Sequence, residues 1–417
     1  MKVLLVTRYF PPSGGGGVQR PLKLATHLPA LGIETHVLAP DDPKWITRDD
    51  DLRPPSQAFV HRARYFGPGA RMPSEELHGL RGVDLALRKA GLFSRRLLVP
   101  DAHVTWSLTA VPAALRIVRE EGIDAVLTTS PPSSVHLIGA AVKARTGTRW
   151  VADLRDPMIA DPDRAAAGLP GRLKERSQYP VARLVARSAD AIVAVAEHIA
   201  EEARSFSPAG RVVVIRNGCD FDDFAGLEYR RADRFRITYT GSFFALRDPR
   251  PFLEAVAQSG DLDVVARFVG RLRPADREWA ESLGLGDRLE LHPYVPRRRA
   301  LELQRDSDAL LLLVADAGGR GRGAPSGKIF DYLAAGRPIL AAVPPDGAAA
   351  DLIRETKAGL VVAPDDVGGL REAVADLHGR WRSGELDGEF ALSPELRDRL
   401  SRRRRAEELA ELLWSLE

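Results

Sequence analysis

The amino-acid sequence predicts an α/β protein made of two doubly wound domains that face each other across a cleft. Short apolar runs alternate with helical patterns along the chain, and this alternation begins anew near residue 236. Strands separated by helices form parallel βαβ units with helices on both faces of a sheet. The length of 417 residues also exceeds what one hydrophobic core usually organises. We therefore expect domains at residues 1–222 and 223–392, and a terminal helix within 393–417 that crosses back to the first domain.

The strands expected in the first domain are apolar runs, and two of them follow glycines, Gly32 and Gly147, that end the preceding helices. These strands cover residues 3–6, 35–39, 125–128, 149–152, 191–195 and 211–215. Asn217 and Gly218 form a turn after the last strand, and the polar segment 220–233 suits a linker between domains.

The strands expected in the second domain follow the same pattern. Residues 309–315 form a continuous apolar run, which is typical of a strand buried on both faces of a parallel sheet. The expected strands cover residues 236–240, 264–269, 289–291, 309–315, 339–343 and 360–362. Ser393 and Pro394 then start a terminal helix that continues to Leu413.

The composition excludes several classes of protein. The 60 basic and 57 acidic residues leave a net charge of +3, which does not indicate nucleic acid as the main partner. Cys219 is the single cysteine, so neither an intramolecular disulfide nor a multi-cysteine metal site is expected. No apolar run approaches the roughly 18 residues of a membrane span, and residues 3–6 are too short for the apolar core of a signal peptide. We expect a cytoplasmic protein.

The most informative segment, residues 324–340, predicts a phosphate-binding helix start. It follows the apolar strand at 309–315, and Ser326 is expected to cap a helix that ends at Gly336. The unpaired N–H groups and the positive dipole end of such a helix attract phosphate. Lys328 adds a full charge there, in a chain with eight lysines and 52 arginines. Asp331, one turn on, suits sugar hydroxyls, although an ordinary exposed ion pair between Lys328 and Asp331 explains the same spacing.

A glycine-rich loop, residues 14–17, follows the first strand and precedes a helix. Without side chains the backbone can approach an anion closely and donate N–H groups to it. The loop lacks the third glycine of a dinucleotide fingerprint and the Gly-Lys-Ser/Thr ending of a P-loop. A ligand-binding loop is expected from its place at a strand end, and a flexible surface loop is the alternative.

Polar residues follow two further strands of the first domain. His136 lies in the first turns of the helix after residues 125–128, where it could face a ligand or serve a structural role. Asp153 and Asp156 follow the next strand, and these carboxylates could bind acceptor hydroxyls or pair with Arg155 between them.

The second domain contributes polar residues after its own first strand. Ser242 and Arg247 follow residues 236–240, and Arg247 is expected to reach a phosphate. Tyr294 and Val295 precede a helix and could contact a nucleotide base, with simple packing as the alternative for Tyr294. No constellation of carboxylates with histidines indicates a metal site, and helix N-termini with lysine and arginine can neutralise phosphate without a metal.

These residues resemble the GT-B glycosyltransferases, and specifically the retaining, sugar-nucleotide-dependent enzymes of family 4. The resemblance spans nearly the whole chain and is most specific at 326–338 and at the Asn217-Gly218 turn. It implies two Rossmann-like domains, with Asp331 on the nucleotide ribose. It also implies that the diphosphate lies at Gly327 and Lys328, helped by the glycine loop. A first-domain histidine lies near the transferred sugar in similar enzymes, and His136 is the positional match.

The resemblance organises the expected site, with two departures. Gly323 stands where the family often has a second glutamate, and Ser242 stands where it often has arginine, which leaves Lys328 and Arg247 as the expected phosphate cations. The expected catalytic residues are His136, Lys328 and Arg247. The expected acceptor contacts are Asp153 and Asp156. The expected donor contacts are Gly15, Gly16, Ser242, Tyr294, Val295, Ser326, Gly327, Ile329 and Asp331.

The expected activity is transfer of a sugar from a nucleotide-diphosphate sugar to a hydroxyl of a glycan, a lipid-linked sugar or a small molecule. The resemblance implies retention of the anomeric configuration. No metal or other cofactor is expected, because helix N-termini, lysine and arginine can neutralise the phosphates. A nucleotide-sugar epimerase of the same fold and a non-catalytic nucleotide-sugar binding protein are the alternatives. Residues 92–99 mix apolar and basic side chains, which suits either peripheral contact with the inner face of the membrane or core packing of a helix end.

Overall fold

The computed structural model describes most of the chain, which divides into two compact units. Unit 1 comprises Met1–Asn217 and Arg402–Glu417, and unit 2 comprises Gly218–Ser401. The described residues are 1–41, 47–68, 77, 79–159, 168–243, 247–316, 320–323, 325–386 and 390–416.

Unit 1 is built on a parallel sheet that has seven strands among the described residues, in the order β3-β2-β1-β4-β5-β6-β7. The strands are β1 Lys2–Thr7, β2 Glu34–Pro40, β3 Phe59–Ala63, β4 Ala125–Ser130, β5 Arg149–Leu154, β6 Ala191–Ala194 and β7 Arg211–Val214. The expected strands of this half are confirmed, with small shifts at their ends. Strand β3 was not expected, because it lies at the sheet edge and its half-exposed sequence includes His61 and Arg62.

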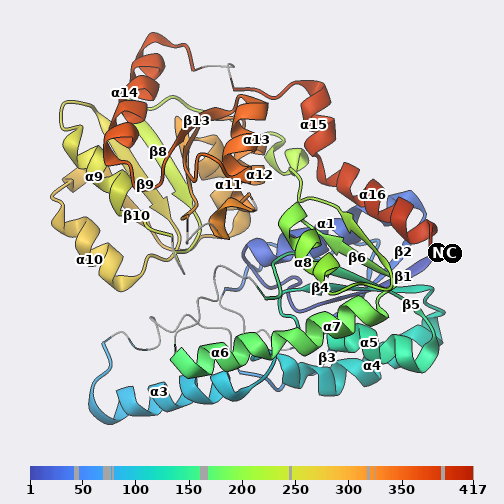
Figure 1. Ribbon diagram of the computed structural model, residues 1–417. Coiled ribbons are helices and arrows are strands. Elements are labelled where there is room, and N and C mark those ends of the chain that lie inside the picture. Colours follow the sequence, from blue (N-terminus) through green and yellow to red (C-terminus); the bar gives the residue numbers. More distant parts are fainter. Residues whose placement is uncertain are drawn as a thin grey trace. The chain divides into compact units, whose positions relative to one another are not determined.

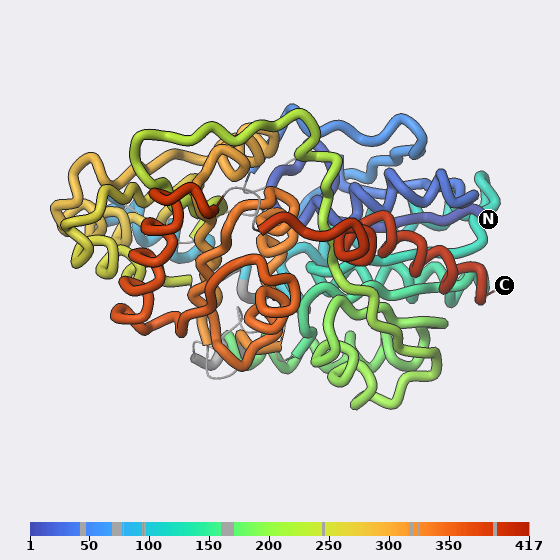
Figure 2. The backbone as a smooth tube through the Cα atoms, turned by 90° about the horizontal axis from the view of Figure 1, so that it is seen from above, coloured from blue at the N-terminus to red at the C-terminus, as the bar shows by residue number. Residues whose placement is uncertain are grey.

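Helices cover both faces of the unit 1 sheet (Figure 1). Helices α1 and α16 pack on one face, and α4 and α5 pack on the other. The chain's two ends lie on the same side of this unit (Figure 2). The helices of unit 1 are α1 Gln19–His27, α3 Gly82–Leu97, α4 Ser107–Glu121, α5 Val135–Thr146, α6 Gly168–Arg176, α7 Gln178–Ser188, α8 Glu197–Ser205 and α16 Arg402–Trp414, with 3₁₀ turns η1 Gly16–Val18, η2 Pro29–Leu31 and η3 Val104–Trp106.

Unit 2 repeats the plan with a parallel sheet that has six strands in the described part of the chain, in the order β10-β9-β8-β11-β12-β13. The strands are β8 Phe235–Thr240, β9 Val264–Val269, β10 Leu289–His292, β11 Ala309–Leu313, β12 Ile339–Ala342 and β13 Gly359–Val362. Every strand expected for this half is present. The continuous burial of β11 confirms that an unbroken apolar run marks a central strand.

The helices of unit 2 also lie on both faces of its sheet. Helices α9 and α14 pack on one face, and α11, α12 and α13 pack on the other. The helices are α9 Arg250–Gln258, α10 Pro274–Ser282, α11 Arg297–Arg305, α12 Lys328–Ala335, α13 Ala348–Thr356, α14 Val367–Ser383 and α15 Pro394–Leu400, with 3₁₀ turns η5 Phe221–Phe224, η6 Gly286–Arg288 and η7 Arg320–Arg322. Each unit is therefore a doubly wound, Rossmann-like fold, as the expected GT-B class requires.

The terminal helix differs from its expected form. Ser393 caps its start by accepting a hydrogen bond from the Leu396 N–H at 3.3 Å, but one helix to Leu413 was wrong. The helix is interrupted at Ser401, which adopts an extended conformation and forms an isolated β-bridge with Cys219. The Cys219 N–H donates to the Leu400 carbonyl at 2.7 Å, so a strand-like contact replaces the next helical turn. The apolar spacing of leucines continues across this break and therefore did not reveal it.

No helix in the described ranges is both long and apolar enough to cross a membrane.

Candidate functional site

The N-terminus of α12 carries Lys328, and its start differs from the expected one. Gly327 is the N-cap residue, with helical dihedrals, and no side chain caps the helix. The expected Ser326 hydroxyl cap is therefore wrong; Ser326 instead accepts a hydrogen bond from the Ile329 N–H through its carbonyl, at 3.0 Å. Gly336 ends the helix in the left-handed conformation, as expected.

The Lys328 side chain lies across the end of β8. Its Nζ is 5.3 Å from the centre of the Tyr239 ring. Gly241 leaves room for it: a Cβ at this position would overlap Lys328 Cε and come within 2.9 Å of Nζ. Gly241 also has φ +125°, a conformation that side chains rarely adopt. Lys328 thus needs a glycine at the strand end in order to lie where it does.

Arg247, like Lys328, interacts electrostatically with Tyr239. Burial raises the pKa of Tyr239 to about 12, and the positive charge of Arg247 acts in the opposite direction on this pKa. The ammonium group of Lys328 lies near the Tyr239 ring at the carboxyl end of β8, and the charge of Arg247 acts on the same tyrosine. Ligands of doubly wound sheets bind at the carboxyl ends of the strands, so two cations here suit an anion.

A hydrogen-bond network holds α12 against β8. The Tyr332 hydroxyl accepts from the Thr240 N–H at 3.0 Å, and Gln304 Nε2 donates to Thr240 Oγ1 at 2.7 Å. Tyr332 is fully buried. This network fixes the start of α12, and with it Lys328, relative to the end of β8.

Asp331 is held by an arginine that sequence reasoning missed. Arg297 donates to Asp331 Oδ1 at 3.2 Å and to Asp223 Oδ2 at 3.1 Å, and it lies 4.0 Å from Asp220 Oδ2. Burial alone would lower the pKa of Arg297, but the charges of Asp331 and Asp223 outweigh it and raise this pKa. The Asp331 side chain is 21% exposed, so it remains reachable while its direction is set.

A signal for Arg297 was present in the sequence. Three consecutive arginines open α11, where the helix dipole disfavours positive charge. Such a run at a helix start indicates carboxylates nearby. Two of those carboxylates, Asp220 and Asp223, belong to the segment 220–233 that was expected to be an unpatterned linker, and the 3₁₀ turn η5 positions them.

The other donor residues expected in unit 2 lie around the same strand ends. Ser242 Oγ accepts from the Arg271 N–H at 3.4 Å, beside Gly241. Ile329 is fully buried, so only its backbone is available to a ligand. Tyr294 and Val295 follow the end of β10 and are half-buried. Their contact with a nucleotide stays a prediction.

The glycine loop of unit 1 is shaped by its backbone. Gly15 has φ +86° and is exposed, as is Gly16, around which a Cβ would meet nothing within 4 Å. Arg155 donates from Nη1 to the Gly17 carbonyl at 2.6 Å and from Nε to the Ser130 carbonyl at 2.6 Å. Arg155, from the Asp-x-Arg-Asp cluster, therefore ties the loop after β1 to the loop after β4.

His136 is fully buried at the start of α5. Its Nδ1 lies 2.8 Å from Thr128 Oγ1, which also accepts from Trp150 Nε1 at 2.8 Å. Its Nε2 is buried and has no hydrogen-bond partner among the described residues. Burial lowers the pKa of His136 to about 4, so the ring is neutral at pH 7. A catalytic role for His136 stays a prediction.

The two expected acceptor residues have different surroundings. Asp153 is 1% exposed and accepts from Arg20 Nη2 at 2.8 Å and from Thr129 Oγ1 at 2.6 Å. Arg20 also donates to the Ile215 carbonyl at 3.0 Å, so it joins α1 to the end of β7. Asp156 is exposed. An acceptor that contacts Asp153 must compete with the Arg20 ion pair, whereas Asp156 is accessible. Both contacts stay predictions.

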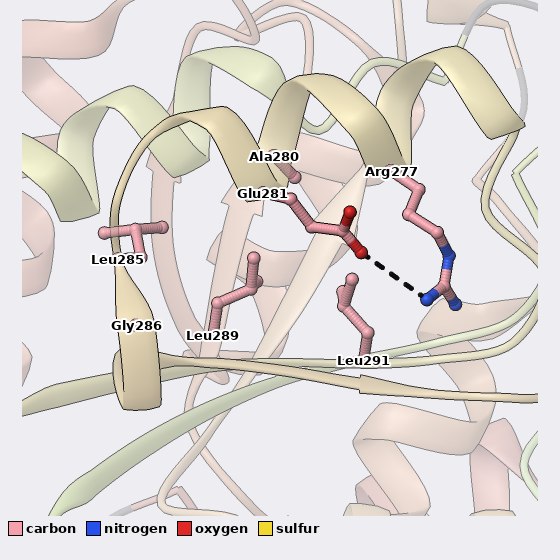
Figure 3. A pocket seen from close by; sticks show the side chains of 7 residues that line it. All are labelled: Arg277, Ala280, Glu281, Leu285, Gly286, Leu289 and Leu291. Atoms are coloured by element: carbon pink, nitrogen blue, oxygen red, sulfur yellow. Dashed lines mark ion pairs between the residues drawn. The ribbon is translucent and has the colours of Figure 1, made fainter.

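One cavity, of about 360 Å³, lies in unit 2 beside α10 and β10. Figure 3 shows its leucine side chains beside the Arg277–Glu281 ion pair, whose atoms are 3.7 Å apart. Its lining residues are Arg277, Ala280, Glu281, Leu285, Gly286, Leu289 and Leu291. None of the predicted site residues lines it, so this cavity is separate from the strand-end site.

Two family models match the chain. One, described as a glycosyl transferase 4-like domain, matches residues 15–218, and the other, described as glycosyl transferases group 1, matches residues 234–380. No curated protein matches the chain.

Solved structures share the fold. A sucrose-phosphate synthase from Thermosynechococcus elongatus is 15% identical with a TM-score of 0.65, over 100% of this chain and 98% of that chain. Anabaena HepE in complex with UDP is 15% identical with a TM-score of 0.63, over 100% of both chains. A glycosyltransferase from Rickettsia africae is 12% identical with a TM-score of 0.63, over 100% of this chain and 98% of that chain. With both halves matched by glycosyltransferase models and the two-sheet architecture shared with these structures, the chain belongs to the group 1 glycosyltransferases of the GT-B fold.

Proposed function

We propose that this protein transfers a sugar from a nucleotide-diphosphate sugar to a hydroxyl acceptor, with retention of the anomeric configuration. The observation that carries the proposal is the pair of cations, Lys328 and Arg247, that act on Tyr239 at the carboxyl end of β8. The solved structures of Anabaena HepE in complex with UDP and with UDP-glucose support a uridine diphosphate donor. The acceptor is a glycan, a lipid-linked sugar or a small molecule.

In the proposed reaction the two cations stabilise the leaving diphosphate. Negative charge builds on the phosphate oxygens as the glycosidic bond breaks, and fixed positive groups lower the energy of that transition state. The positive dipole end at the start of α12 adds to the same effect. The acceptor hydroxyl attacks from the face that the diphosphate leaves, so the configuration is retained without the carboxylate pair of retaining glycosidases.

Asp331 is proposed to bind the two ribose hydroxyls. Its carboxylate oxygens accept hydrogen bonds, and the Arg297 contacts hold the direction of the side chain. Tyr294, Val295, Ser242, Gly15 and Gly16 are proposed to complete the donor contacts, mainly through the backbone at the glycines. His136 is proposed to act near the sugar as a neutral imidazole, and Asp153 and Asp156 near the acceptor.

The transfer is proposed to need no metal ion or other cofactor, because lysine, arginine and helix N–H groups supply the positive charge. Saturating EDTA should therefore leave the transfer rate within about twofold of its untreated value. A rate that collapses in EDTA and returns with Mg²⁺ or Mn²⁺ would contradict this part of the proposal.

The donor is tested by thermal unfolding in UDP, GDP, dTDP and ADP. A ligand that binds only the folded state raises the unfolding midpoint, and UDP should raise it most. A larger rise with another nucleotide would overturn the uridine assignment.

The reaction is tested with the donor so identified and a panel of hydroxyl acceptors. Release of UDP that requires an acceptor, together with an NMR coupling constant that shows an unchanged anomeric configuration, would support retaining transfer. Release of UDP without any acceptor, with an altered sugar as product, would indicate the epimerase. Tight donor binding without turnover would indicate a binding protein.

We also propose that unit 1 contacts the inner face of the membrane through α3. This helix exposes large apolar side chains, with Val83 74%, Leu87 65% and Leu97 66% exposed, and it carries basic residues such as Arg95. Apolar burial combined with attraction to anionic lipids is how such helices bind membranes. The side chains of Ser94 and Arg96, within the segment 92–99, lie outside the described residues.

Co-sedimentation with vesicles that contain anionic lipid tests this contact. The wild-type protein should sediment, and Leu87→Glu combined with Leu97→Glu should abolish it. Trp414→Glu, a change of an exposed apolar residue on α16, is the matched control and should sediment normally. Equal sedimentation of all three proteins would rule out α3 as the contact.

A further inference from the structure

Two histidines and a glutamate that are far apart in sequence meet at the edge of the unit 1 sheet. They are His36 in β2, His61 in β3 and Glu121 at the end of α4, and their ligand atoms all lie within 4.8 Å of one another. His36 Nδ1 and His61 Nε2 are 3.0 Å apart. The predicted site residues do not include any of the three.

The sheet register brings the three side chains to one face. Parallel pairing aligns Leu38 with His61, so His61 stands two residues beyond the partner of His36. Residues two apart along a strand point to the same face, which places His36 and His61 together. Helix α4 packs against β2 and β3, and its last residue is Glu121.

Glu34 sets the proton on the His36 ring. It lies two residues before His36 on the same face of β2, and its Oε1 is 3.0 Å from His36 Nε2. Glu34 Oε1 also forms an ion pair with Lys2 Nζ at 2.8 Å, so its carboxylate accepts the hydrogen bond from His36. His36 Nε2 must therefore donate, which leaves the Nδ1 lone pair directed at His61. A carboxylate on the second ring nitrogen is the usual support of a metal-binding histidine.

We propose that His36 Nδ1, His61 Nε2 and the Glu121 carboxylate bind one divalent metal ion of the zinc class. Two imidazole nitrogens and a carboxylate oxygen are a donor set that suits Zn²⁺ and excludes Ca²⁺ and Mg²⁺, which take oxygen ligands. Zinc–nitrogen bonds of about 2.0–2.1 Å in a tetrahedron separate two nitrogens by about 3.3 Å, close to the observed 3.0 Å. Glu121 approaches the two rings when the metal binds.

The surroundings favour a cation at this place. Carboxylates outnumber basic side chains among the charged groups around the two rings: Glu34, Glu120 and Glu121 stand against Lys2 and Arg116. The bound metal joins edge strand β3 to β2 and α4, which protects an edge that would otherwise invite pairing with other chains.

Zinc binding to the tag-free, EDTA-stripped full chain tests the proposal. Titration with ZnCl₂ against a chromophoric zinc indicator should show one tight site, and zinc should raise the unfolding midpoint. His61→Ala should weaken that site at least 100-fold, and Glu34→Gln should weaken it about 10–100-fold through the loss of the outer carboxylate. Co²⁺ should show the intense visible absorption of a tetrahedral site in the wild type and not in His61→Ala.

The matched control is His292→Ala. His292 also lies on an edge strand, β10, beside a carboxylate, with its Nε2 3.4 Å from Glu290 Oε2. This variant should keep the tight zinc site, and circular dichroism of His61→Ala should confirm that it folds. Absence of a tight site in the wild type, or an equal zinc affinity in folded His61→Ala, would overturn the proposal. Both outcomes are independent of the transferase activity.

Discussion

In both units polar residues lie at the carboxyl ends of parallel strands, but the exposure of these side chains differs between the units. In unit 1, Asp153 is 1% exposed beneath Arg20, and His136 is fully buried against Thr128. In unit 2, the Asp331 side chain is 21% exposed while Arg297 holds it. An enclosed ion pair mainly maintains the structure around it, whereas a partly exposed one can still meet a ligand. The following predictions test this contrast.

The largest effect is expected from Arg20→Ala. Removal of Arg20 leaves the Asp153 carboxylate buried, with the Thr129 hydroxyl as its remaining donor among the described residues. Breaking a buried pair in this way costs about 3–5 kcal/mol of unfolding free energy. Urea unfolding measures the loss.

Arg204→Ala is the control for Arg20→Ala. Arg204 pairs with Glu197 at the surface, where the two side chains are 46% and 59% exposed, so its loss should cost about 1 kcal/mol or less. If both variants lost the same small amount of unfolding free energy, the Arg20–Asp153 pair would not stabilise the fold, and the contrast between the units would be wrong.

A comparable effect, but on catalysis, is expected from Lys328→Ala. Removing one group that stabilises transition-state charge lowers kcat by about 10²–10³-fold. The half-buried Lys328 contributes little to folding, so the unfolding midpoint should hardly change. Steady-state kinetics and thermal unfolding of the same preparation separate the two effects, and near-normal turnover would remove Lys328 from the mechanism.

Gly241→Ala offers a second test of Lys328. The added Cβ would overlap Lys328 Cε and force the side chain away from the strand end. Turnover should fall toward that of Lys328→Ala, and the double variant should be little worse than either single one. Additive losses would show that the two residues act separately.

The pH dependence of stability tests the buried state of His136. The pKa of about 4 lies below the ordinary 6.5, so between these values the unfolded chain binds more protons than the folded one. Stability is therefore lost as pH falls from 6.5 to 4, by up to about 3 kcal/mol for this group. His136→Gln should lose less stability than wild type over this window.

His103 must be accounted for in that experiment, because burial also lowers its pKa to about 4 and it acts in the same direction. Urea unfolding at pH 7, 6, 5 and 4 of wild type, His136→Gln and His103→Gln separates the two contributions. If the pH dependence of unfolding free energy were the same in His136→Gln as in wild type, the His136 ring of the wild type would be protonated equally in the folded and unfolded states.

The smallest effect is expected from Arg297→Lys. A lysine keeps the positive charge but loses the fork that reaches Asp331 and Asp223 together. The fold should persist, while donor affinity should fall about tenfold because Asp331 loses its direction. Arg298→Lys is the control, since Arg298 is 58% exposed and pairs with Glu302. Calorimetric titration measures the UDP affinity of both variants. If Arg297→Lys bound UDP as tightly as Arg298→Lys, Arg297 would have no role in donor binding.

Much of the fold could be predicted because its signals are local. A continuous apolar run such as β11 and a glycine that ends a helix, such as Gly336, are visible within a few residues. Strand β3 and the break at Ser401 escaped for a physical reason. The half-exposed edge strand has little apolar periodicity, and the break depends on a contact with Cys219, far away in the chain.

The candidate site could be predicted only in part. The sequence indicated Lys328 and Asp331 because a helix start after a buried strand has a known chemistry. It did not indicate the partners of the carboxylates. Asp331 is paired with Arg297, 34 residues away, and Asp153 with Arg20, 133 residues away. The expected serine cap at Ser326 was wrong because the helix begins one residue later, at a glycine N-cap.

The sequence alone determined the two-domain α/β class and the position of helix α12, because burial periodicity and helix ends are encoded by neighbouring residues. Strand register and helix packing determined which side chains come into contact: Arg20 with Asp153, Arg297 with Asp331, and His36 with His61. Those contacts join residues 25 to 133 positions apart, and their energies depend on burial, which exists only once the sheets have formed.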